Sequence, residues 1–115
     1  RPIPIWGGAF RPVAIERVCR ILDGFFPRMP LDDKTEGRME RVFKLLETNG
    51  RDATRVGLDA TVYCEGEDVE QWLCDAERWR KLGANHISVQ TLGQGYATWD
   101  RHIDAVRRFM EGLSG

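Results

Sequence analysis

The sequence lacks the features of a membrane-spanning or secreted protein. No stretch approaches the ~18 consecutive apolar residues of a transmembrane helix. The start, Arg1-Pro2-Ile3-Pro4, has neither the charged-then-apolar order of a signal peptide nor an initiator methionine. We therefore expect a cytoplasmic location and no membrane partner, and we expect the chain to have been cut from a longer one.

Metal ligands and disulfide frameworks are also missing. The cysteines, Cys19, Cys64 and Cys74, are odd in number, lack CxxC spacing and lie in apolar segments, as small buried hydrophobic residues do. His86 and His102 are the only histidines, and neither has a cysteine pair at zinc spacing nearby. The sequence predicts reduced thiols and no metal site.

No sign of charge dominates the chain. The 17 basic and 18 acidic side chains are spread along its length and give a net charge of -1. Without a basic stripe, the sequence gives no reason to expect nucleic acid as a partner. The 115 residues, 42% hydrophobic and 30% charged, fit one globular unit covering 1–115.

What the sequence does contain is a fourfold alternation of strand and helix patterns. Short apolar or β-branched runs predict strands at 3–6, 25–27, 56–64 and 86–92. Apolar residues at intervals of three and four predict helices at 11–22, about 35–48, about 68–82 and about 98–113. Thr35 and Thr98 are candidate helix caps. The βαβαβαβα order predicts an α/β fold with a parallel sheet.

The apolar positions also predict which helix faces are buried. The third helix has the clearest pattern, with Trp72 and Trp79 on its apolar face as core residues. The predicted buried positions of the first helix are Ala14, Ile15, Val18, Ile21 and Leu22. Those of the second helix are Met39, Val42, Phe43, Leu45 and Leu46. Those of the last helix are Ile103, Val106, Phe109, Met110 and Leu113.

Two architectures fit four βα units. They make half of a (β/α)8 barrel, a fold of roughly 250 residues, or else an open four-stranded domain. In the open domain the apolar helix faces could cover only one side of a sheet that needs cover on both. We therefore favour the half barrel.

One turn has the composition of an anion site. Gly7-Gly8-Ala9-Phe10 lies between the first strand and the first helix, where small residues let a ligand approach the free N–H groups of a helix N-terminus. The alternative reading is an ordinary tight turn.

Four segments in order carry a family resemblance: Pro4-Ile5-Trp6-Gly7-Gly8, Leu22-Asp23-Gly24-Phe25-Phe26-Pro27, Asn49-Gly50-Arg51-Asp52, and Leu82-Gly83-Ala84-Asn85-His86-Ile87-Ser88-Val89. Together they resemble the C-terminal half of the luciferase-like monooxygenases, although Ala53 stands where the family has proline. The resemblance implies the C-terminal half of a (β/α)8 TIM barrel from a flavin- or deazaflavin-dependent oxidoreductase, with FMN or coenzyme F-420 as cofactor and a small-molecule substrate.

The resemblance also implies where the cofactor phosphate binds. The family's backbone contacts fall on Gly7, Gly8, Ala9 and Phe10, after the fifth strand of the barrel, whereas barrels in general place phosphate after strands seven and eight. The N-terminal half of the same barrel would supply the ring contacts and most of the substrate pocket. No catalytic residue is therefore assigned here, and we expect the fragment alone to be inactive.

Other interpretations of single residues and of the whole chain stay open. Arg28, Gln90 and Thr91 follow or end strands and could touch a ligand, or could be surface or core-lining residues. The chain could instead be a non-catalytic half-barrel module that pairs with a copy of itself and holds a phosphorylated ligand, or a remnant without function. Unpaired sheet edges would make the isolated chain oligomeric or aggregation-prone.

Overall fold

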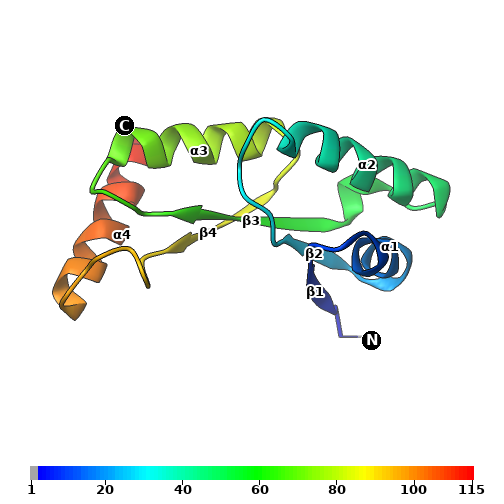
Figure 1. Ribbon diagram of the computed structural model, residues 1–115, viewed down its shortest axis with the longest axis horizontal. Coiled ribbons are helices and arrows are strands. Elements are labelled where there is room, and N and C mark those ends of the chain that lie inside the picture. The colour runs from blue at the N-terminus through cyan, green and yellow to red at the C-terminus, as the bar shows by residue number, and fades with distance from the viewer. Residues whose placement is uncertain (1–2) are drawn as a thin grey trace.

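The computed structural model describes residues 3–115; Arg1 and Pro2, the start of the predicted domain, lie outside them. Four βα units follow one another in the described chain, with one short 3-10 turn. They are β1 (Trp6–Ala9), α1 (Pro12–Ile21), β2 (Gly24–Pro27), α2 (Thr35–Thr48), η1 (Ala53–Arg55), β3 (Gly57–Tyr63), α3 (Val69–Lys81), β4 (His86–Gln90) and α4 (Trp99–Ser114). The strands form one parallel sheet in the order β1-β2-β3-β4 (Figure 1). The predicted α/β fold is confirmed, and its order is that of a half barrel.

One face of the sheet packs against helices. Leu58, Ala60 and Val62 alternate along β3 and are buried, and Figure 1 shows α2 and α3 lying along the same side of the strands. Trp72 and Trp79 of α3 are 1% and 2% exposed, so the prediction that they form core is confirmed. The predicted face of α2 is also confirmed, since Met39, Val42 and Leu46 are buried and Phe43 and Leu45 pack against the core.

The opposite side of the sheet, here called the open face, is more exposed and largely polar. It carries Trp6 and Gly8 of β1, Phe26 of β2, Asp59 and Thr61 of β3, and Ser88 and Gln90 of β4. The Asp59 carboxylate accepts a hydrogen bond from Ser88 Oγ at 2.9 Å across the β3–β4 pair. No stripe of buried residues marks a second core on this face.

A tryptophan fills one end of the open face. The Trp6 ring lies 5.4 Å from the Phe26 ring and 5.1 Å from the His86 ring, in edge contact with the latter. A Cβ atom at Gly24 would lie 2.0 Å from the Trp6 ring, and one at Gly57 would lie 2.1 Å from it. Both glycines therefore make room for an indole that reaches across β2 and β3 towards β4.

The first strand begins and ends later than predicted. The sequence predicted residues 3–6 with Gly7-Gly8 as the turn, but β1 covers Trp6–Ala9 and includes both glycines. Ala9 is 4% exposed and pairs with Pro27, whereas Ile3 and Ile5 are 83% and 61% exposed. Glycine is tolerated inside this strand because the side chains of Leu22 and Arg28 lie close to the positions that a Cβ atom would occupy at Gly7 and Gly8.

Neither of the two threonines predicted as helix caps uses its hydroxyl group to cap a helix. Thr35 is the first residue of α2 rather than its cap, and its hydroxyl donates to Pro30 O at 2.8 Å and accepts from Asp32 N at 2.7 Å. Thr98 does occupy the N-cap position of α4, but its hydroxyl bonds Asp100 instead of a backbone N–H. Thr35 therefore fixes the loop before α2 instead of capping the N-terminus of the helix.

The predicted buried faces of the first and last helices are partly wrong. Ile21 of α1 is 67% exposed. On α4, Phe109 is buried, but the other predicted positions, Ile103, Val106, Met110 and Leu113, are exposed. Ala105 and Phe109 are the buried residues of α4, and this helix packs mainly against α3, so its most apolar stripe is left without cover.

Two of the segments that carry the family resemblance have structural roles. Arg51 donates from Nη1 to Cys19 O at 3.0 Å and so satisfies the carboxyl end of α1, while Asp52 accepts from Thr54 N and caps η1. Asn85 accepts from Leu58 N at 2.7 Å and donates to Val56 O, which joins the starts of β3 and β4. Arg51 thus holds its loop to α1, and Asn85 holds its loop to the sheet.

No helix among residues 3–115 has both the length and the apolar content needed to cross a membrane.

Candidate phosphate-binding site

The connection from β1 to α1 leaves backbone donors exposed. Only Phe10 and Arg11 separate the strand from the helix, and Pro12 occupies its first position, where its missing N–H does no harm. The first bond of the helix runs from Ile15 N to Arg11 O, and no side chain caps the N-terminus. The N–H groups of Val13 and Ala14 are therefore without helical partners at the positive end of the helix dipole, an arrangement that suits an anion.

The four residues predicted to contact phosphate fall into two pairs. Ala9 O accepts from Arg28 N at 3.1 Å, so Gly7 and Ala9 direct their backbone groups towards β2. Gly8 and Phe10 alternate with them and direct theirs towards the unpaired edge of β1. Of the four, Gly8 and Phe10 therefore have N–H groups available for a ligand or another strand, and the predicted contacts of all four stay a prediction.

The two glycines of this strand also differ in what surrounds them. A Cβ at Gly7 would lie 2.4 Å from Leu22 Cδ1, because Gly7 faces α1 and lets the strand and helix approach. A Cβ at Gly8 would instead lie 3.3 Å from Arg28 Cγ on the open face. Gly7 is therefore a packing glycine, whereas Gly8 keeps a surface position open beside a flexible cationic side chain.

A hollow of about 300 Å³ opens at the N-terminus of α1. Its walls include Phe10 and three arginines, Arg11, Arg38 and Arg41. The Arg38 guanidinium lies over the Phe10 ring, 5.8 Å from its centre, which joins α2 to the β1–α1 turn. Three guanidinium groups and the helix N-terminus make this hollow a favourable place for a phosphate.

One carboxylate moderates the positive charge of the hollow. Arg38 Nη1 lies 3.5 Å from Asp32 Oδ2. The backbone N–H of Lys34, and then the nearby Arg38 charge, lower the pKa of Asp32 below its ordinary value. Arg38 is thus partly neutralised, whereas Arg41 forms no ion pair within residues 3–115.

Sequence reasoning missed these arginines. Arg38 and Arg41 occupy the polar side of α2, where charged residues on most helices simply face water. Nothing in their spacing distinguishes them from such residues. Only the packing of α2 beside α1 brings them to the β1–α1 turn.

The other candidate ligand residues do not converge on the hollow. Arg28 lies against Gly8 on the open face, and its guanidinium has no bonded partner among the described residues. Gln90 donates to Leu92 O at 3.4 Å, and Thr91 Oγ1 lies 2.8 Å from His102 Nδ1. These two side chains fix the loop after β4, and only Arg28 is placed to reach a ligand near Gly8.

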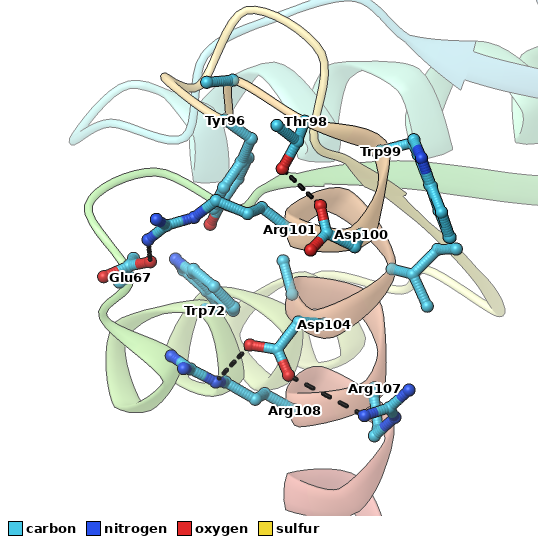
Figure 2. A pocket seen from close by; sticks show the side chains of 13 residues that line it. Glu67, Trp72, Tyr96, Thr98, Trp99, Asp100, Arg101, Asp104, Arg107 and Arg108 are labelled. Atoms are coloured by element: carbon cyan, nitrogen blue, oxygen red, sulfur yellow. Dashed lines mark hydrogen bonds and ion pairs between the residues drawn. The ribbon is translucent and has the colours of Figure 1, made fainter.

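A larger open hollow of about 830 Å³ lies between the start of α3 and α4 (Figure 2). Its charged groups are mostly paired with one another: Arg101 lies 2.9 Å from Glu67, and Arg108 lies 3.0 Å from Asp104. The Trp72 indole N–H, which also borders it, donates to Glu65 O. With its polar groups satisfied internally, this hollow offers an anion less than the β1–α1 turn does.

No group of three or more His, Cys, Asp or Glu side chains able to hold a metal ion occurs in the described part of the chain. No family model matches the sequence, and no curated protein matches it.

Proposed function

We propose that this chain forms the C-terminal half of a luciferase-like (β/α)8 barrel and contributes the phosphate-binding turn of a flavin- or deazaflavin-dependent oxidoreductase. Four further βα units would complete the barrel and supply the ring and substrate contacts. The parallel order of four βα units supports the barrel, and the four matching sequence segments support the family.

The observation that carries this proposal is the set of donors around the β1–α1 turn. Free N–H groups of Phe10, Val13 and Ala14 lie at the same end of the sheet as a hollow lined by Arg11, Arg38 and Arg41. Parallel α/β folds bind ligands at the carboxyl ends of their strands, and this turn lies at that end of β1.

In this proposal the chain binds and orients, and the cofactor performs the redox chemistry. FMN and coenzyme F-420 both carry a phosphate, and either would accept hydrogen bonds from the turn and charge-assisted bonds from the arginines. Once the phosphate is held, the rest of the cofactor can extend over the open face past Gly8, where no Cβ obstructs it. Arg28 lies beside that path.

A second candidate function is a non-catalytic module that holds a phosphorylated ligand and pairs with its own copy. The exposed apolar residues along both sheet edges favour it. In that case phosphate binding would be retained, but flavins would bind no more tightly than other phosphorylated ligands of similar size.

A charge-removing pair of variants tests the phosphate site. We expect Arg41→Gln to weaken FMN binding about threefold to tenfold, because Arg41 lines the hollow and has no competing ion pair in the described chain. Lys44→Gln is the matched control, since it removes the same charge from the same helix outside the hollow. Calorimetric titration measures both, and equal effects of the two substitutions would contradict the assignment.

A further inference from the structure

Both outer strands of the sheet have an unpaired edge within residues 3–115. On β4, Gln90 O accepts from Cys64 N, so Gln90 and Ser88 face β3, while Ile87 and Val89 direct their backbone groups outward. On β1 the outward residues are Trp6 and Gly8. Each edge therefore offers the donors and acceptors that another parallel strand needs.

The helix next to the β4 edge has an uncovered apolar stripe. Five residues at intervals of three and four form it, and their exposed fractions are large: Trp99 76%, Ile103 49%, Val106 36%, Met110 55% and Leu113 56%. At about 100° per residue, this stripe is turned about a quarter of the way around the helix from Ala105 and Phe109, which are buried. The contact of α4 with α3 therefore involves only the side of α4 that carries Ala105 and Phe109, and the stripe itself stays exposed.

The stripe borders space on the helix-covered side of β4. Leu113 and Ile87 line the same open hollow of about 390 Å³, together with Leu73 of α3. Ile87 is 37% exposed, and Val89 is only partly buried. The carboxyl-terminal end of α4 thus stands off from β4 and leaves room beside the edge of the sheet.

The opposite edge has a matching set of exposed residues. Ile3 and Ile5 precede β1, and Ile21 projects from α1 with 67% of its surface exposed. Cys19, which contacts Val42 O of α2, lies about 160° away from Ile21 around the helix. Ile21 therefore faces away from α2, towards the side where a neighbouring unit would pack.

We propose that two copies of this chain close an eight-stranded parallel barrel around a two-fold axis, the second copy taking the place of the four further βα units; this inference rests on the second candidate function, the module that pairs with its own copy. In this arrangement β1 of one copy pairs with β4 of the other, and the α4 stripe packs over that strand and against Ile21 of its helix. A second copy fits because all four strands run in the same direction, so rotation about the barrel axis brings β1 to β4 in parallel orientation. Four units are half of the eight that close such a barrel. The N–H groups of Val13 and Ala14 lie beyond the paired strands, so they stay available to a phosphate after closure, whereas the outward backbone groups of Gly8 would be used in strand pairing.

The oligomeric state is the first test. Light scattering coupled to gel filtration should give twice the 13.2 kDa mass of the chain over a wide concentration range. A monomer throughout that range would overturn the proposal, and so would an open-ended polymer, because edge-to-edge pairing without closure extends indefinitely.

A mixing experiment tests which surfaces meet. One variant carries Ile103→Lys and Met110→Lys on the α4 stripe, and the other carries Ile21→Glu on the opposite edge. All three positions are exposed, so each variant should keep its fold, as circular dichroism can check, and each should lose dimer affinity at least tenfold. Mixing the two should restore the dimer, because one interface is then unmodified and the other brings opposite charges together. Folded variants that stay monomeric when mixed, or an α4 variant that still dimerises, would overturn the pairing of α4 with α1; Lys44→Glu on α2 is the control expected to dimerise normally.

Discussion

Replacing Gly57 by alanine should lower the free energy of unfolding by about 3 kcal/mol. The added Cβ would lie 2.1 Å from Cη2 and 2.2 Å from Cζ2 of Trp6. The indole contacts the Phe26 and His86 rings, at 5.4 and 5.1 Å, and would lose these contacts if it moved. Either the ring leaves the open face or β3 shifts, and both outcomes disturb contacts that extend from β1 to β4.

Urea denaturation measures this loss, and two further variants identify its cause. In the background of Trp6→Leu, the same Gly57→Ala change should cost much less, because the ring that it meets is gone. Gly37→Ala in α2 is the matched glycine control: its Cβ meets nothing within 4 Å, so alanine there should stabilise the helix by up to about 1 kcal/mol. An undiminished loss in the Trp6→Leu background would show that the indole is not what excludes a side chain at Gly57.

In the full-length parent that we propose, valine at Gly8 is expected to weaken cofactor binding at least tenfold, equivalent to about 1.4 kcal/mol, while changing the melting temperature of the ligand-free protein little. The valine side chain would project onto the open face beside the turn, where we propose that the cofactor passes. Its nearest neighbour is the flexible part of Arg28, with Cγ 3.3 Å from the Cβ position, so the fold can adjust. Binding and stability should therefore respond differently.

At the adjacent glycine, Gly7, we expect a substitution to change stability rather than cofactor binding. At Gly7, a Cβ would meet Leu22 Cδ1 at 2.4 Å between β1 and α1, so Gly7→Ala should lower the melting temperature while the side chain stays away from the ligand path. Calorimetric titration and thermal melting on both variants separate the two roles. If Gly8→Val leaves the dissociation constant unchanged, or if both substitutions affect stability alone, Gly7-Gly8 is only a packed strand segment.

The sequence predicted the order of the elements because each pattern depends on a local period. The spacing of Trp72, Ala76 and Trp79 fits only a helix with one buried face, and Gly83, with φ of 107°, ends that unit where expected. The first strand was placed too early because Gly7-Gly8 has the composition of a turn. Both glycines belong to the strand because they pair with Phe25 and Phe26 of β2, a tertiary contact that the local composition does not indicate.

The exposed stripe of α4 and the arginines of the candidate site could not be predicted for a different reason. The apolar positions Ile103, Val106 and Met110 have the same spacing whether they pack against this sheet or against another surface. The periodicity therefore indicated an apolar helix face but not the surface that covers it. Arg41 lines the hollow only because α2 packs beside α1. Both features depend on tertiary contacts that a single sequence does not encode in its local pattern.

The most direct test of the phosphate site is an NMR titration of the ¹⁵N-labelled chain with FMN, with riboflavin as the control that has the same ring system without the phosphate. We expect FMN and inorganic phosphate both to shift the backbone N–H signals of Phe10, Val13 and Ala14, and riboflavin to leave these signals unchanged. Equal shifts with FMN and riboflavin, or phosphate-dependent shifts confined to other parts of the chain, would contradict the assignment of the phosphate to the β1–α1 turn.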